Sequence, residues 1–308
     1  MGSSVRWRWW PRAVVLVATT TVISSPSWYW EAGPPLNPPS PSPTQVPLKD
    51  SSTRDEALML VHQKTHSEAV LTDKPFVSAH QEDPALVSYL RHQLAPPSAL
   101  PYNLTNPEKQ DFSQFGQPLH LVKNLLHGMK GGFFVEAGAV DGEFLSNTLY
   151  LERWLGWTGL LVEPYPVTYE RLLYKHRRAY SINAALSVTN VSSSVFLRPA
   201  GDNGVLSTVE ERGLQVRAIP LFSLLKALNV TIVDFLSLDV EGDEVKVLKT
   251  IPWDKIRIRV LCVEFNHVPE GHRRLRRYVV SKGYRFLAYR KIDMWFGWPS
   301  LLAQTMRG

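Results

Sequence analysis

The chain contains a single cysteine, Cys262, among its 308 residues. An internal disulfide is therefore excluded, and no group of His and Cys has the spacing of zinc ligands. The sequence also lacks a Gly-x-Ser-x-Gly turn, which argues against hydrolases built on that nucleophile. Because Cys262 falls within an apolar segment, we interpret it as a small core side chain. We predict no bound metal.

Charged residues are absent between residues 13 and 30. As a helix, these 18 residues would span about 27 Å, just short of the ~30 Å hydrocarbon core of a bilayer. Residues 1–12 are basic and rich in tryptophan, which predicts a cytoplasmic N-terminus and a type II signal-anchor transmembrane helix over 13–30. A cleaved signal peptide is the alternative, because the apolar centre over 13–23 is short and two serines follow it.

Apolar periodicity is missing from residues 31–82, whose first part is rich in proline and serine. Such a composition builds no core and favours extended polyproline II. We therefore predict a stalk and linker over 31–82. The folded domain is predicted over 83–308, where Asp83 precedes a helical pattern.

The net charge of +6 would by itself suggest a nucleic-acid partner. Part of the basic excess lies in residues 1–12, where membrane topology explains it. Much of the rest belongs to one predicted helix, in Arg273, Arg274, Arg276 and Arg277. We interpret this run as a solvated helix face, with a phosphate or acidic-partner site as the alternative. No nucleic-acid partner is predicted.

The segment 133–142 is an apolar run that leads into a glycine turn with two carboxylates, Glu136 and Asp141. Gly138 and Gly142 have no Cβ, which lets the backbone approach a bound nucleotide closely. Such turns also occur as plain connections between a strand and a helix. The nucleotide interpretation is favoured because a second apolar run ends in Glu163, about twenty residues further on, where a ribose-binding acid is expected.

Strand and helix patterns then alternate to the end of the chain. A nearly continuous apolar run over 231–238 ends in Asp239 and Glu241, and another over 260–263 ends in Glu264. Acids at the carboxyl ends of buried parallel strands lie where open α/β sheets bind their ligands. The sequence therefore predicts an α/β fold with a doubly wound, mostly parallel, Rossmann-like sheet.

These residues resemble the FkbM-type S-adenosylmethionine-dependent methyltransferase domain. The resemblance rests on four motifs in order: the loop Glu136 to Gly142, the acid Glu163, Asn183-Ala184-Ala185-Leu186-Ser187, and Leu238-Asp239-Val240-Glu241-Gly242. Within that family, the amino-acid sequence of residues 136–148 and 156–164 is similar to that of the animal Star proteins. The likeness covers about residue 83 to the C-terminus.

The resemblance implies S-adenosylmethionine as cofactor. Its amino-acid end would contact the loop residues Glu136, Gly138, Ala139, Asp141 and Gly142. Its ribose hydroxyls would donate to Glu163, and its adenine would lie near Asn183 and Ala184.

Methyl transfer to a hydroxyl requires positioning and a base that removes the proton. Asp239 and Glu241 are the first candidates for base or substrate anchor, with capping of the next helix as the structural alternative. Glu264 and His267 are a second candidate pair, although a histidine in a loop is more often simply solvated.

Two functions follow from this interpretation. Star proteins are membrane-anchored proteins of the secretory and endosomal route, associated with export of growth-factor precursors. The closer resemblance to them implies a protein of the endoplasmic reticulum, Golgi or endosome that serves vesicle-mediated trafficking of such a client. The alternative is an active O-methyltransferase of the secretory pathway, acting on a glycan or another hydroxylated acceptor. Three glycosylation sequons, at Asn103, Asn190 and Asn229, are compatible with a luminal domain.

Overall fold

The computed structural model describes residues 76–198, 208–210 and 213–299. The chain divides into two units, 1–49 and 50–308, and every described residue belongs to the second. The predicted basic N-terminus, signal anchor and proline-rich part of the stalk lie outside the described residues. Within the described ranges, no helix combines the length and apolarity needed to cross a bilayer.

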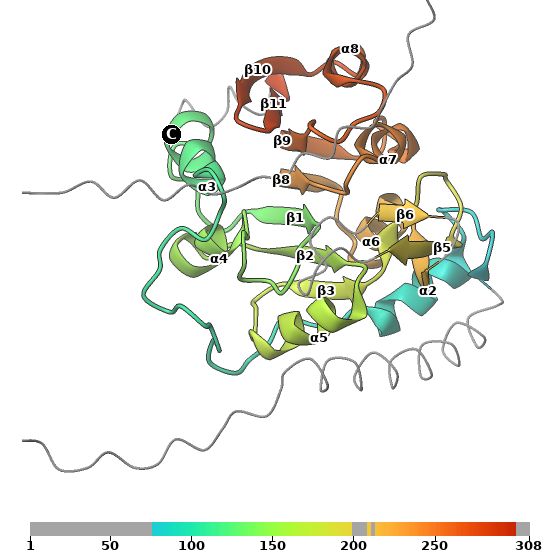
Figure 1. Ribbon diagram of the computed structural model, residues 1–308, viewed down its shortest axis with the longest axis horizontal. Coiled ribbons are helices and arrows are strands. Elements are labelled where there is room, and N and C mark those ends of the chain that lie inside the picture. The colour runs from blue at the N-terminus through green and yellow to red at the C-terminus, as the bar shows by residue number, and fades with distance from the viewer. Residues whose placement is uncertain (1–75, 199–207, 211–212, 300–308) are drawn as a thin grey trace, which may run out of the picture. The chain divides into compact units, whose positions relative to one another are not determined.

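The centre of the described fold is a seven-stranded sheet in the order β10-β11-β9-β8-β1-β2-β3 (Figure 1). Its strands are β1 (Phe133–Ala137), β2 (Thr158–Glu163), β3 (Tyr180–Asn183), β8 (Ile232–Leu238), β9 (Arg257–Glu264), β10 (Arg285–Arg290) and β11 (Asp293–Gly297). The five strands from β9 to β3 are parallel to their neighbours, whereas β11 runs antiparallel between β9 and β10. The predicted mostly parallel α/β sheet is therefore confirmed.

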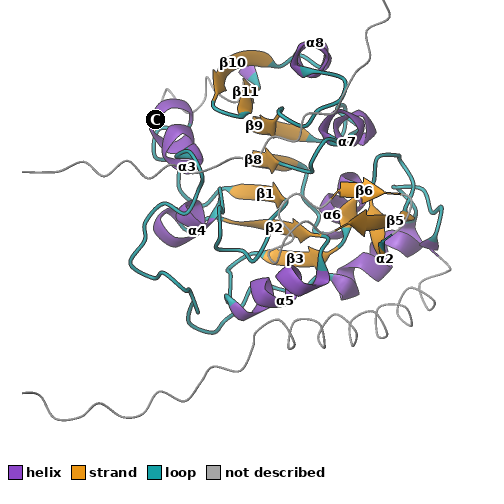
Figure 2. Cartoon of the chain, in the orientation of Figure 1, coloured by secondary structure: helices purple, strands orange, loops and turns teal. Residues whose placement is uncertain are grey.

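Helices cover both faces of this sheet (Figure 2). They are α2 (Pro84–Gln93), α3 (Gln117–His120), the π-helical turn η2 (Leu121–Leu125), α4 (Leu149–Leu155), α5 (Pro166–Tyr174), α6 (Leu221–Ala227), α7 (Glu244–Thr250) and α8 (His272–Ser281). The larger core lies under α2, α6, α7 and α8, and the smaller one under η2, α4 and α5. Cover on both faces explains why the inner strands read as continuous apolar runs.

Side-chain alternation along β8 distributes its residues between the two cores. Leu236 and Leu238 pack into the larger core, while Phe235 packs into the smaller one. Ser237 also points to the smaller-core side, at the carboxyl end of the strand, where it reaches a cavity rather than the core. The polar carboxyl end of β8, an otherwise apolar strand, therefore lies at the edge of the sheet where ligands are expected to bind.

A second sheet, which the sequence analysis did not predict, follows β3 directly. Its order is β4-β7-β5-β6, formed by β4 (Ala185–Leu186), β5 (Ser193–Arg198), β6 (Thr208–Glu210) and β7 (Leu214–Ile219). Short strands with half-exposed faces have weak apolar patterns, so their pairing is decided by tertiary contacts. This sheet places Ala185, Leu186 and Leu197 against the cavity described below.

The packed region extends to the N-terminal side of residue 83. The Ser78 amide donates to the Ser192 carbonyl at 2.7 Å, and the Phe76 ring stacks on Tyr89 with centroids 4.6 Å apart. Residues 76–82, assigned to the linker from sequence, thus contact the fold. As expected, Asp83 begins α2, where its carboxylate accepts from the Ala85 amide at 2.8 Å.

Candidate active site

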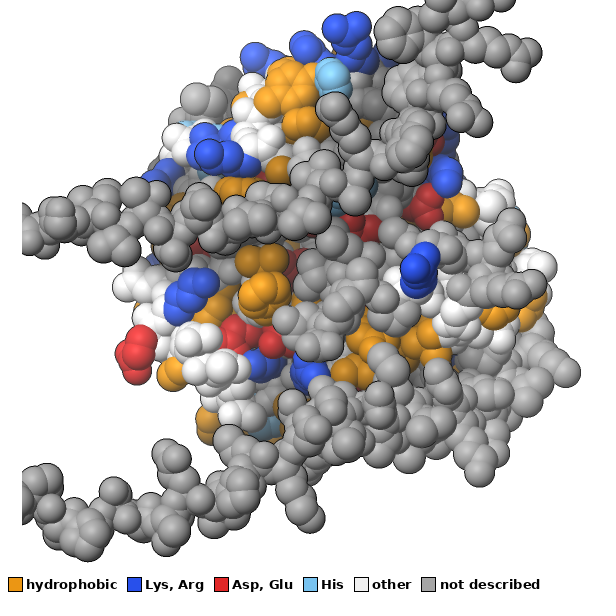
Figure 3. Space-filling model, viewed as in Figure 1, with side chains coloured by type: hydrophobic (Ala, Val, Ile, Leu, Met, Phe, Trp, Pro, Cys, Tyr) orange, Lys and Arg blue, Asp and Glu red, His pale blue; other side chains and the backbone are white. Residues whose placement is uncertain are grey.

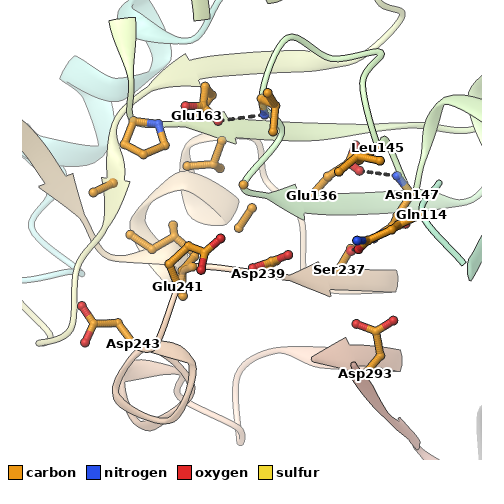
Figure 4. Close-up of a pocket in the computed structure, with 18 of the residues that line it drawn as sticks. Gln114, Glu136, Leu145, Asn147, Glu163, Ser237, Asp239, Glu241, Asp243 and Asp293 are labelled. Carbon is orange, nitrogen blue, oxygen red and sulfur yellow. Dashed lines mark hydrogen bonds between the residues drawn. The ribbon is translucent and has the colours of Figure 1, made fainter. Parts of the chain in front are cut away.

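A cavity opens at the carboxyl ends of β1, β2 and β8 (Figure 4). Its volume is about 1100 Å³ when measured out to open solvent. The elements around it come from separate parts of the chain: the loop before α3, the β1–α4 loop, the second sheet, the turn after β8, and the start of β11. This is the position at which open α/β sheets bind ligands.

The four acids expected at this edge all line the cavity: Glu136, Glu163, Asp239 and Glu241. Two further acids, Asp243 and Asp293, line it as well. No lysine or arginine is found among the lining residues that the structure describes. A lining of this charge favours a cationic ligand and disfavours the phosphates of a dinucleotide.

Glu136, at the end of β1, holds the loop that follows it. Its carboxylate accepts hydrogen bonds from the Ser146 hydroxyl at 2.9 Å, the Asn147 amide at 2.5 Å and the Thr148 hydroxyl at 2.5 Å. Burial raises the pKa of Glu136, and the nearby Arg177 and the three donors oppose that shift. The conformation of the loop before α4 therefore depends on this carboxylate.

Glu163, at the end of β2, is held in the same way. One oxygen accepts from the Val140 amide at 2.8 Å, and the other from the Tyr165 amide at 2.9 Å and the Thr168 hydroxyl at 2.8 Å. Burial raises the pKa of Glu163 to about 7, although these hydrogen bonds act against it. A carboxylate offers about four lone-pair sites, so one remains for a ligand.

The two loop glycines serve internal packing. Gly138 has φ +87°, and a Cβ placed there would lie 2.2 Å from the Asp239 carbonyl oxygen. At Gly142, with φ +78°, a Cβ would meet Leu172 at 3.0 Å. Both glycines were predicted to make room for a ligand, but the space beside each is filled by the protein's own chain. Gly138 lines the cavity and Gly142 does not.

Three non-glycine residues of the lining have left-handed backbone conformations: Val140 with φ 49°, Leu145 with φ 58° and Glu241 with φ 55°. Such conformations cost of order 1–3 kcal/mol each and persist where the surroundings impose them. Their gathering around one cavity is typical of a functional site.

Four residues predicted at the cofactor lie beside the cavity and do not line it: Ala139, Asp141, Gly142 and Asn183. The Asp141 carboxylate accepts from the amides of Glu143 and Phe144, and lies 3.5 Å from the Lys175 ammonium. This carboxylate is occupied in shaping the turn.

Asn183 ties the ends of β2 and β3 together. Its side-chain amide donates to the carbonyls of Glu163 at 2.9 Å and Pro164 at 3.1 Å. The next residue, Ala184, does line the cavity, beside Val162 and Leu186. Together these small and aliphatic side chains form the apolar part of the lining.

The three residues predicted for catalysis lie near one another after β8 and β9. Asp239 and Glu241 line the cavity, and the His267 Nδ1 atom lies 2.8 Å from the Glu241 Oε2 atom. His267 is half exposed and lies outside the lining. Gly242 permits this approach, because a Cβ at that residue would lie 2.9 Å from the His267 carbonyl oxygen.

The environment of Asp239 disfavours its charged form. Burial, followed by repulsion from Glu241 and Glu264, raises its pKa well above the ordinary range. Its Oδ1 atom is buried and has no hydrogen-bond partner among the described residues. A buried oxygen without a partner is costly, which indicates a position completed by a ligand.

Glu244 receives the amides of the turn before α7, from Val240 at 2.9 Å and Gly242 at 3.1 Å. The N-cap residue of α7 is Asp243, and no side-chain capping bond to the helix is recorded, so the capping role considered for Asp239 and Glu241 is not observed. Asp239, Glu244 and Glu264 have carboxylate oxygens within 4.8 Å of one another. Protonation relieves the repulsion in this group, since burial raises the pKa of Glu244 to about 7, and the acidic cluster alone does not indicate a metal.

The opposite wall of the cavity was not predicted from the sequence. Asp293, 5% exposed at the start of β11, accepts from the Gln117 side-chain amide at 2.9 Å, and burial raises its pKa to about 6. Asn147 donates to the Ser237 hydroxyl at 2.9 Å, while its Oδ1 atom is buried without a described partner. The one available signal was an acid placed within the apolar segment 292–297.

The strand order and the acid-lined cavity define a methyltransferase-like α/β domain. Residues 136–286 match the family model described as Methyltransferase FkbM domain. This similarity extends from the end of β1 into β10 and includes most of the residues that line the cavity. Gln117 and Asp293 lie outside the matched region, so part of this wall is formed by segments beyond it.

Several solved structures are similar to this chain. The FkbM methyltransferase of Methylobacillus flagellatus is 15% identical with a TM-score of 0.40, and the match covers 69% of this chain and 58% of that one. The METTL16 methyltransferase domain is 14% identical with a TM-score of 0.36, covering 58% and 65%. The fibrillarin pre-rRNA processing protein of Methanococcus jannaschii is 12% identical with a TM-score of 0.38, covering 62% and 76%. Among curated proteins, no sequence matches.

Proposed function

We propose that this protein is an S-adenosylmethionine-dependent O-methyltransferase whose acceptor is a hydroxyl group. The observation that carries the proposal is a cavity at the cofactor edge of the sheet that is lined by six acids. Two of its lining residues have a buried side-chain oxygen without a hydrogen-bond partner among the described residues. These oxygens belong to Asp239 and Asn147. The FkbM family match supports the same chemistry.

The lining fits the proposed cofactor. The sulfonium and ammonium of S-adenosylmethionine are cationic, which suits an acidic cavity. The remaining lone-pair site of Glu163 is suited to a ribose hydroxyl, and Val162, Ala184 and Leu186 offer an apolar surface for adenine. When bound, the cofactor supplies an electrophilic methyl group, and the protein's task is chiefly to position the acceptor.

The Glu241–His267 pair is suited to removing the acceptor proton. Glu241 faces the cavity and His267 lies on its outer side, half exposed to solvent. The proton would pass from the acceptor oxygen to the Glu241 carboxylate and leave through the imidazole of His267. The raised pKa of Asp239 favours its protonated form, which has a hydrogen to donate and would orient the acceptor oxygen.

The first experiment is a thermal-shift measurement on the full chain with S-adenosylhomocysteine. A ligand at 100 times its dissociation constant stabilises the folded state by about 2.7 kcal/mol. The shift should appear in the unmodified protein, weaken in Glu163→Ala, and persist in Glu108→Gln, a change at an exposed glutamate that does not line the cavity. Absence of any shift in the unmodified protein would overturn the enzymatic proposal.

A second candidate function is the trafficking role implied by the resemblance to Star proteins. The observation that favours it is the internal occupation of Glu136 and Glu163, each of which accepts three hydrogen bonds from the protein itself. Such a fold would bind client proteins without transferring methyl groups. The chain would then be a type II membrane protein, anchored through 13–30, of the endoplasmic reticulum, Golgi or endosome.

This second candidate predicts that depletion of the protein retains a membrane growth-factor precursor in the endoplasmic reticulum. Re-expression of Glu241→Gln separates the two functions. Full restoration of export by that variant supports a role without catalysis, whereas export that is normal after depletion counts against trafficking altogether.

A further inference from the structure

The segment 271–292, which forms α8 and β10, is unusually basic. It contains six arginines, two lysines and no acid, so its charge of +8 exceeds the +6 of the whole chain. Seven of these cations are exposed: Arg273, Arg274, Arg276, Arg277, Arg285, Arg290 and Lys291. We call these seven residues the basic strip. Figure 3 shows Lys and Arg side chains gathered along the margin over α8 and β10.

The helical half of the basic strip faces outward as a unit. At 100° per residue, its four arginines occupy an arc of about 160°. Leu275 and Val279, on the opposite side of α8, are fully buried. None of the seven cations makes an ion pair with another residue in the described part of the chain. The strip therefore holds charge that the fold does not neutralise.

The strand half leads to the cavity. Arg290 ends β10 and Lys291 begins the turn to β11, and the two residues that follow, Ile292 and Asp293, line the cavity. The Ile292 carbonyl accepts from the Phe265 amide at 2.9 Å, which fixes the turn against the end of β9. An extended ligand lying on the strip could therefore reach the cavity at this turn.

The cavity and the basic strip have opposite charge, so each is expected to bind different chemical groups of one ligand. An anionic group is repelled by the ionised acids of the cavity and attracted by the basic strip. An uncharged hydroxyl is free to enter the cavity. The fitting ligand carries hydroxyls and anionic groups side by side along an extended chain.

We propose that the basic strip binds an acidic polysaccharide and presents one of its hydroxyls to the cavity. This inference rests on the methyltransferase function proposed above for the cavity itself. Guanidinium groups, which dominate the strip, pair bidentately with carboxylates and bind sulfates through the same planar array of donors. The exposed Tyr289, packed edge-on against His272 with centroids 6.0 Å apart, offers a ring face beside the cations.

The same surface suits two other polyanions less well. A helix lying in a membrane interface needs an apolar face, but Leu275 and Val279 of α8 are turned into the core. Single-stranded nucleic acid binds where successive bases stack on exposed aromatic rings. The exposed rings of segment 271–292 are those of His272 and Tyr289, which pack edge-on against each other and form no row of free ring faces. Phe286 is half-buried beneath Arg276, whose guanidinium lies 4.0 Å from its ring centre.

The test measures binding of fluorescein-labelled heparin to the purified full chain by anisotropy. The strip variant neutralises the four helical arginines as R273Q, R274Q, R276Q and R277Q. The matched control neutralises four exposed lysines elsewhere, as K123Q, K130Q, K226Q and K249Q. We expect at least a tenfold weaker affinity in the strip variant, a change below threefold in the control, and a lower salt dependence in the strip variant alone.

Equal losses in the strip variant and the control would overturn the proposal, because general charge would then explain binding. Tighter binding of oligodeoxythymidine or of phosphatidylserine vesicles than of heparin, lost in the strip variant, would also overturn it by assigning the strip to another partner. Neutral dextran should not bind. The thermal shift with S-adenosylhomocysteine should be the same in the strip variant as in the unmodified protein. Heparin binding without any thermal shift would contradict the methyltransferase proposal but would still support the basic strip as a polysaccharide-binding surface.

Discussion

The Nδ1 atom of His267 lies 2.8 Å from the Oε2 atom of Glu241, although the two residues follow different strands, β9 and β8. The parallel order of these strands brings both loops to one edge, and Gly242 removes the side chain that would keep them apart. A carboxylate on the cavity and an imidazole open to solvent are joined by this contact.

If this pair removes the acceptor proton, Glu241→Gln should lower the rate of methyl transfer by about 10²–10⁴-fold, the usual range for a general base. His267→Gln should lower it by roughly tenfold, because Glu241 would still face the acceptor. Radiolabelled methyl transfer measures both effects. The thermal shift with S-adenosylhomocysteine is the control and should be unchanged; full activity in Glu241→Gln would remove it from the mechanism.

The stability of the fold should depend on pH through Glu163. Burial raises its folded pKa from the ordinary 4.5 to about 7, so the unfolded chain releases this proton at lower pH than the folded chain does. The free energy of unfolding therefore falls as pH rises from about 4.5 to 7, by roughly 3 kcal/mol for this group. Urea denaturation at pH 5 and pH 8 measures the difference.

Glu163→Gln should reduce the difference in the free energy of unfolding between pH 5 and pH 8. Any effect of the substitution that is equal at the two pH values leaves this difference unaffected. Glu108→Gln, at an exposed position, should leave the difference unchanged. An unaltered pH dependence in Glu163→Gln would show that the buried carboxyl is not its source.

A side chain at Gly138 should destabilise the domain severely. Its φ of +87° is unfavourable for other residues, and a Cβ would lie 2.2 Å from the Asp239 carbonyl oxygen. We expect Gly138→Ala to cost roughly 2–4 kcal/mol from strain and overpacking together. Gly131→Ala is the matched control, because Gly131 has φ +66° with nothing within 4 Å, and should cost about 1 kcal/mol. Equal costs in urea denaturation would contradict the packing argument.

Asp293 should affect the acceptor and not the cofactor. It lies on the wall away from Glu163 (Figure 4), where Gln117 holds its carboxylate at 2.9 Å. Asp293→Asn should raise the KM for the acceptor by about tenfold through one weakened hydrogen bond. Calorimetric affinity for S-adenosylhomocysteine should stay constant, and a parallel loss of that affinity would place Asp293 at the cofactor instead.

A luminal domain should be glycosylated at three exposed asparagines, Asn103, Asn190 and Asn229, none of which lines the cavity. Peptide N-glycosidase should lower the mass of the protein made in secretory cells. Replacement of each asparagine by glutamine should remove one glycan, with protein made in bacteria as the unglycosylated control. An unchanged mass after enzyme treatment would contradict the luminal orientation.

Strand β8 was predictable because its residues satisfy one local rule. Cover on both faces requires an apolar run, and the acids that follow at Asp239 and Glu241 are expected at the ligand edge. Strand β11 was not predictable, because it is inserted antiparallel between β9 and β10 by pairing with residues distant in sequence. Asp293 reaches the cavity only through that insertion.

The sequence by itself determined the alternation of buried strands and helices and the acids at the strand ends, since periodicity and burial act on neighbouring residues. Only the tertiary structure decided what each acid faces. Glu136 meets donors of its own loop, and Glu163 meets donors of its own loop and of the loop after β1. Asp239 retains an oxygen without a partner among the described residues, and Glu241 meets His267. The reason is physical: hydrogen bonds and charge repulsion depend on distances between loops, and those distances are set by the packing of the whole sheet.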